Sequence, residues 1–106
     1  MAWSEPELDR RTKEVLIDAY NEDEQLGSFE CTMDELLGKP VECEVLGRAA
    51  TLLSVTAAGV FLGLRATLRL DGVHVETSLV DVELGSAAPT DLALTIAAYK
   101  RWVRAP

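Results

Sequence analysis

Residues 41–84 read VECEVLGRAATLLSVTAAGVFLGLRATLRLDGVHVETSLVDVEL, and this stretch decides the fold. At its start, three apolar residues alternate with Glu42 and Glu44, which is the pattern of a half-buried strand. Turn residues then divide the remainder into further strands, which we expect at residues 50–56, 60–70 and 73–84. The stretch therefore predicts an antiparallel sheet of about four short strands.

Glycine-containing turns mark the boundaries between these strands. Asp71-Gly72 is a strong hairpin signal, because both residues tolerate the positive φ angles of a tight turn. Gly47-Arg48 and the segment 57–59 are the other expected turns. Within residues 73–84 the alternation changes phase near Leu79-Val80, which indicates a bulge or a bend.

Helices are expected on both sides of this sheet. Over residues 22–37, apolar residues recur at helical spacing, Asn21 is a suitable N-cap, and Gly38 and Pro40 end the pattern. A second helix begins at Thr90, with Leu92, Ile96, Tyr99 and Val103 on one face. The expected fold class is α+β: a small antiparallel SH3-like β-barrel flanked by an N-terminal and a C-terminal helix. We expect residues 1–12 to be a flexible leader and residues 13–106 to form a single SH3-like barrel domain with its flanking helices.

The charge of the chain is concentrated near its N-terminus. The 106 residues carry a net charge of −8. Residues 1–44 hold 13 acids and 4 bases, whereas residues 45–106 hold 5 acids and 6 bases. This distribution argues against nucleic acid and anionic membrane surfaces as partners, and it favours a divalent cation or a basic protein partner. The acidity is also explained by solubility alone.

The expected location is cytoplasmic. No apolar run approaches the roughly 20 residues of a membrane span, and the polar N-terminus is unlike a secretory signal. Cys31 and Cys43 lie in apolar contexts and read as reduced core thiols.

Motifs for catalysis are lacking, so we expect no enzymatic activity. The chain has one histidine, His74, beside a hairpin turn, and its pattern there is that of an exposed strand residue. There is no C-x-x-C spacing for zinc and no G-x-S-x-G nucleophile motif. A divalent-metal enzyme is a weaker alternative, because no histidine or lysine base lies near the acids in the sequence.

Oxygen ligands are abundant in the segment DAYNEDEQ, residues 18–25. Calcium takes six to eight oxygen ligands, several of them from carboxylates. Helical geometry adds Glu30 and Asp34 on the face of Asp23, within roughly 40° of it, and Glu35 on a neighbouring stripe. The spacing is not that of an EF-hand, and ordinary helix capping beside a solvated face is the alternative explanation.

A family resemblance favours a calcium site over helix capping alone as the explanation of these acids. Residues 14–37, EVLIDAYNEDEQLGSFECTMDELL, resemble the cyanobacterial calcium-binding protein family (CcbP-type), whose members carry an Asp-Ala-Tyr-(Gly/Asn)-Glu-Glu-Glu-Gln-like run. The resemblance implies an SH3-like barrel and an acidic surface at the N-terminal helix that binds calcium ion, for buffering or sensing. The ligands it implies here are Asp18, Glu22, Asp23, Glu24, Asp34 and Glu35. The competing hypothesis is an acidic protein–protein interaction module without metal.

Overall fold

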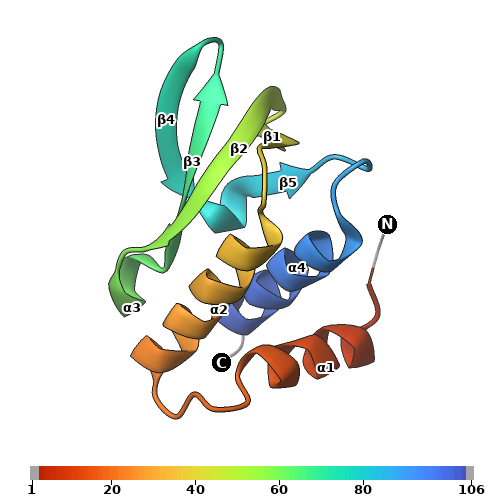
Figure 1. Ribbon diagram of the computed structural model, residues 1–106, viewed down its shortest axis with the longest axis vertical. Helices are drawn as coiled ribbons and strands as arrows, with labels where there is room; N and C mark the ends of the chain where they lie inside the picture. The colour runs from red at the N-terminus through yellow and green to blue at the C-terminus, as the bar shows by residue number, and fades with distance from the viewer. Residues whose placement is uncertain (1–2, 105–106) are drawn as a thin grey trace.

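The chain folds into one twisted sheet with its three long helices on one side, as the computed structural model shows for residues 3–104 (Figure 1). The helices α1, α2 and α4 span Glu5–Val15, Glu22–Leu36 and Thr90–Arg104. The strands are β1 (Val41–Val45), β2 (Arg48–Ala57), β3 (Leu64–Leu70), β4 (Val73–Ser78) and β5 (Val82–Leu84). A short helical turn, α3 (Gly59–Leu62), joins β2 to β3, and a 3-10 turn, Leu79–Asp81, joins β4 to β5. None of the helices in this range is long and apolar enough to span a membrane.

The five strands form an antiparallel sheet in the order β4-β3-β2-β1-β5. The expected α+β class and antiparallel pairing are confirmed, but the closed barrel is not. β4 and β5 are the edge strands, and no pairing joins them within the described part of the chain. At Leu79–Asp81 the expected bend is a 3-10 turn, which carries the chain from β4 at one edge to β5 at the other, so the described chain links the two edges without the strand pairing that would close a barrel.

The segment that follows β2 differs from the strand expected at residues 60–70. Residues Val60–Leu62 lie in α3, and the strand begins only at Leu64. Gly59 and Gly63 adopt φ angles of 86° and 69°, which glycine reaches without steric cost. The Ala58 N–H donates to the Gly63 carbonyl, and the Gly63 N–H donates to that of Gly59, so the turn is closed by its own backbone.

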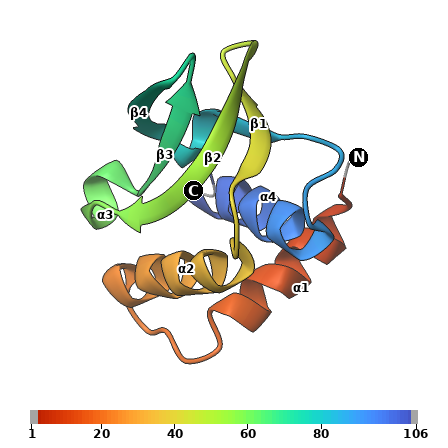
Figure 2. The ribbon, with the colours of Figure 1, turned by 45° about the horizontal axis from the view of Figure 1, so that its top comes forward.

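Helices α2 and α4 pack beneath the sheet, and α1 lies beyond them, away from the sheet (Figure 2). Leu26, Phe29 and Met33 of α2 are buried, as their helical spacing predicts. Phe29 contacts Tyr99 and Trp102 of α4, with ring centroids 5.5 and 5.3 Å away. This aromatic cluster joins the two helices at the centre of the molecule.

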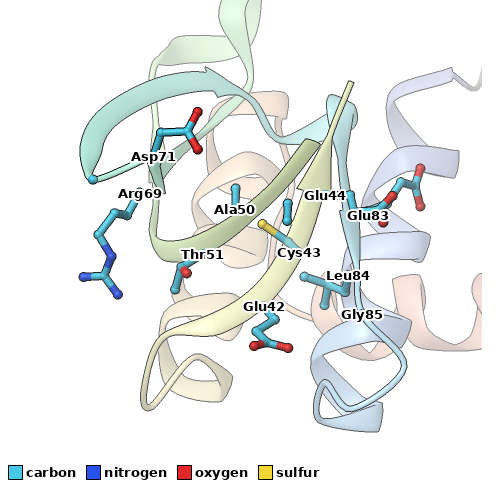
Figure 3. Close-up of a pocket in the computed structure, with 12 residues that line it drawn as sticks. Glu42, Cys43, Glu44, Ala50, Thr51, Arg69, Asp71, Glu83, Leu84 and Gly85 are labelled. Carbon is cyan, nitrogen blue, oxygen red and sulfur yellow. The ribbon is translucent and has the colours of Figure 1, made fainter. Parts of the chain in front are cut away.

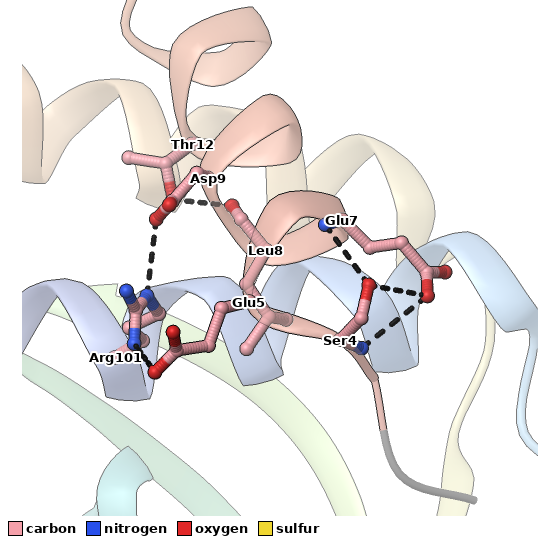
Figure 4. Close-up of polar contacts among 7 residues, drawn as sticks. All are labelled: Ser4, Glu5, Glu7, Leu8, Asp9, Thr12 and Arg101. Carbon is pink, nitrogen blue, oxygen red and sulfur yellow. Dashed lines mark hydrogen bonds and ion pairs between the residues drawn. The ribbon is translucent and has the colours of Figure 1, made fainter.

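Helix α1 corrects the expectation of a flexible leader for residues 5–12; residues 1–2 lie outside the described range. Ser4 and Glu7 form a capping box, and Pro6 lies in the first turn, where a missing N–H costs nothing. The hydrogen bonds to Ser4 hold the pKa of the Glu7 carboxyl below its usual range. Figure 4 shows that Arg101 of α4 pairs with Glu5 at 3.2 Å and Asp9 at 3.0 Å. Pairing across the chain thus orders a segment whose charge density alone suggests disorder.

Candidate functional site

The six residues expected to bind calcium lie on or just before α2. Asp18 is in the loop between α1 and α2, three carboxylates occupy the first turn of α2, and two lie near its end. All six are exposed, and within residues 3–104 none of them takes part in an ion pair. The residues are Asp18, Glu22, Asp23, Glu24, Asp34 and Glu35. Their carboxylates are therefore open to a cation from solvent.

The length of α2 separates these carboxylates into two groups. With a rise of 1.5 Å per residue, the backbones of Glu24 and Asp34 are about 15 Å apart along the helix. Calcium–oxygen distances are 2.3–2.6 Å, so one ion cannot bridge the two ends. Across residues 3–104, no three acidic, histidine or cysteine side chains are gathered closely enough to hold a metal ion as they stand. The donor chemistry fits calcium, whereas the side chains are spread over the surface.

Capping accounts for part of the acidity at the start of α2. The Asn21 side-chain oxygen accepts from the Glu24 N–H at 2.9 Å, and the Asn21 amide donates to Glu24 Oε1 at 2.8 Å. Carboxylates in a first helical turn also interact favourably with the helix dipole. Of the three acids there, Glu24 therefore has a local structural function, whereas Glu22 and Asp23 make no side-chain hydrogen bond among the described residues.

Glu30, which helix geometry placed with Asp23 and Asp34, is used inside the fold. Its Oε2 accepts a hydrogen bond of 2.6 Å from the Ala57 N–H at the end of β2. The side chain is half-buried and ties α2 to the sheet. We assign it a structural function, because its carboxylate already satisfies a backbone donor.

Acidic residues on the sheet form a second candidate that the sequence reasoning missed (Figure 3). Glu44 of β1 lies directly opposite Glu83 of β5, and Glu42 is two residues away on the same strand. These side chains line a shallow depression of about 640 Å³ beside Asp71, which pairs with Arg48. Like charges in directly opposed positions repel, and Lys100 relieves this by approaching Glu83 Oε1 to 3.1 Å. The alternation Val41 to Val45 showed that Glu42 and Glu44 share a face, but only the register of β5 adds Glu83.

The remaining reactive side chains are scattered. Cys43 is buried, as expected, and burial raises the pKa of its thiol. Cys31 was also expected in the core, but it is exposed on α2. His74 is exposed on β4, as its position beside the hairpin turn predicted. No nucleophile–base pair follows from these positions.

The fold is shared with calcium-binding proteins of known structure. The chain superposes on Anabaena CcbP with a TM-score of 0.75, 15% sequence identity, and coverage of 98% of this chain and 94% of that one. It also superposes on a calcium-binding protein in its calcium-binding form, with a TM-score of 0.74, 16% identity, and coverage of 97% and 95%. No protein-family model and no curated protein matches the sequence. The resemblance noted at residues 14–37 is thus confirmed at the level of the fold. Sequence identities of 15% and 16% establish a shared fold and no more.

Proposed function

We propose that this protein binds calcium ions through the exposed carboxylates of the α1–α2 loop and of α2, and that it buffers or senses calcium without catalysis. The observation that carries the proposal is the set of six carboxylates that have no basic partner among residues 3–104. Within the same range, six other acids are engaged in ion pairs. Apart from Glu24, whose Oε1 accepts from Asn21, these acids are therefore open to a cation, and carboxylates are the ligands that calcium prefers.

The fold supports the same proposal. Both structures described above are calcium-binding proteins, and they match nearly the whole chain. The run of acids at residues 18–24 also lies within residues 14–37, the part of the sequence that resembles the family.

The start of α2 is the stronger of the two candidate positions. Asp18, Glu22, Asp23 and Glu24 supply up to eight carboxylate oxygens and four negative charges. The helix N-terminus opposes a cation with the equivalent of only about half a positive charge, so the carboxylates outweigh it. Asp34 and Glu35 supply four oxygens, supplemented by unpaired carbonyls of the last helical turn, and form a weaker second position.

Isothermal titration of calcium into matched variants tests both the function and its location. We expect Glu22→Gln with Asp23→Asn to weaken calcium binding at least tenfold, and Asp34→Asn with Glu35→Gln to weaken it less. The control is Glu42→Gln with Glu44→Gln on the sheet, which removes the same charge and should leave the affinity within about twofold.

Two results would contradict the proposal in different ways. Wild-type protein that gives no calcium heat at millimolar concentration does not bind calcium. Binding that survives the α2 changes but is lost in the sheet variant would place the ion at Glu42, Glu44 and Glu83.

A further inference from the structure

A patch of large apolar side chains is exposed at the tip of the β2–β3 connection. Val60, Phe61 and Leu62 of α3 are 47%, 99% and 62% exposed, and Val103 near the end of α4 is 45% exposed. We call these four residues the α3 patch. Three consecutive exposed apolar residues are unusual on a folded domain, and such patches commonly mark interaction sites.

The turn that carries this patch is held in a fixed shape. Besides its backbone hydrogen bonds, it is anchored to the core where the Leu64 N–H donates to the Tyr99 hydroxyl at 2.8 Å. Gly63 lies so close to this hydroxyl that an added Cβ would meet it at 2.6 Å. Phe61 is thus presented on a preorganised turn, which reduces the entropy lost when it binds a partner.

Beside the patch runs a groove of about 550 Å³ between α2, α3 and α4. Buried residues of the aromatic core, among them Leu26 and Tyr99, form its floor, and Trp102 adds further aromatic surface. Glu22 and Gln25 of α2 supply its polar rim. The groove therefore combines an apolar interior with one carboxylate at its edge.

The charge around the groove is negative. Glu22 has no ion-pair partner within the described chain, and Asp23 and Glu24, which do not line the groove, add negative charge in the same helical turn. Of the nearby bases, Arg101 is engaged by two carboxylates of α1, and Arg104 lines other depressions. A chain of net charge −8 repels a second copy of itself and an anionic membrane, and it attracts a basic segment.

We propose that this groove and the α3 patch bind a segment of a protein partner that presents an apolar side chain next to lysine or arginine. The apolar side chain packs against Phe61 and enters the groove, and the cation lies beside Glu22. Aromatic anchors in such positions typically dominate the binding energy of an interface. Glu22 is shared with the proposed calcium position, so the test is run without calcium. Failure to bind the peptide under that condition leaves the calcium proposal untouched.

The test measures peptide binding by fluorescence anisotropy in the presence of EDTA. The probe is a labelled synthetic amphipathic peptide of about 15 residues, which corresponds to four helical turns. It carries leucine and phenylalanine on one face and lysine on the other. A peptide of the same composition with a scrambled order is the probe control. We expect Phe61→Ser to weaken binding of the amphipathic peptide at least tenfold and Glu22→Gln to weaken it severalfold. The matched controls, Leu46→Ser (Leu46 is 88% exposed) and Glu44→Gln, should bind like the wild type.

Several results would overturn this proposal. These are an absence of binding by the wild type, equal binding of the scrambled peptide, or equal losses in the Phe61 and Leu46 variants. Sedimentation velocity that shows a dimer abolished by Phe61→Ser would assign the patch to a second copy. Cosedimentation with phosphatidylcholine vesicles that depends on Phe61 would assign it to a lipid surface.

Discussion

Replacing Tyr99 by phenylalanine removes one oxygen from the core and leaves the aromatic ring in place. That oxygen accepts the hydrogen bond of the Leu64 N–H at 2.8 Å, where β3 begins. Tyr99 is 1% exposed and Leu64 is 0% exposed, so the N–H loses its acceptor in a buried position. The change therefore isolates one hydrogen bond that fixes the α3 turn to α4.

The expected loss in the free energy of unfolding follows from the burial of the Leu64 N–H. A buried N–H left without a partner costs about 1–3 kcal/mol. For a chain of this size, each kcal/mol lowers the melting temperature by roughly 4–8 °C. The ring contacts with Phe29 and Trp102 remain, so the change vacates only the space of one oxygen atom.

Chemical denaturation by urea, followed by tryptophan fluorescence, measures this loss. Tyr20→Phe is the matched control, because Tyr20 is 84% exposed and the same change there should alter the free energy of unfolding by less than about 0.5 kcal/mol. Equal stabilities of the Tyr99 variant and the wild type would refute the argument, since the Leu64 N–H would then have another partner.

Two further predictions concern the same core. Glu30→Ala should lower the free energy of unfolding by about 1.5–3 kcal/mol, because the Ala57 N–H loses a charged acceptor, and Glu30→Gln should lower it less. Neither change should alter the heat of calcium binding. A loss of that heat would assign Glu30 to the ion site. Burial raises the pKa of the Tyr99 hydroxyl, so the unfolded chain loses this proton first, and stability should fall as the pH rises above about 10. Denaturation at several pH values should show a shallower fall for Tyr99→Phe, and identical slopes would contradict the pKa direction.

Local patterns predicted the elements whose residues interact mainly with their own neighbours. Helix α2 follows from its apolar spacing and from Asn21, and β1 follows from simple alternation. The helical turn α3 was mistaken for the start of a strand, because apolar residues at 60–62 fit either structure and the flanking glycines decide between them. Helix α1 was missed although its capping box, Ser4 and Glu7, is a local signal; only its pairing with Arg101, more than 90 residues away, lies beyond local pattern.

The candidate site was predictable in its chemistry but not in its geometry. The acids of residues 18–24 are visible in sequence, and so is their separation from Asp34 by the length of a helix. Which acids are already engaged depends on contacts between distant segments, such as Glu30 with Ala57 and Glu83 with Lys100. The sequence alone therefore could not separate available carboxylates from those that hold the fold together.

The most direct test of the central claim is the calorimetric titration of calcium into the wild-type protein, with magnesium as the competing ion. Flexible, exposed carboxylates suit the larger calcium ion, whereas magnesium demands near-ideal octahedral geometry and retains its water. We predict a saturable heat of calcium binding and a weaker heat with magnesium. The calcium affinity should fall at least tenfold in the variant with Glu22→Gln and Asp23→Asn. No saturable heat with calcium at millimolar concentration, from protein whose folding is verified by circular dichroism, would contradict the account.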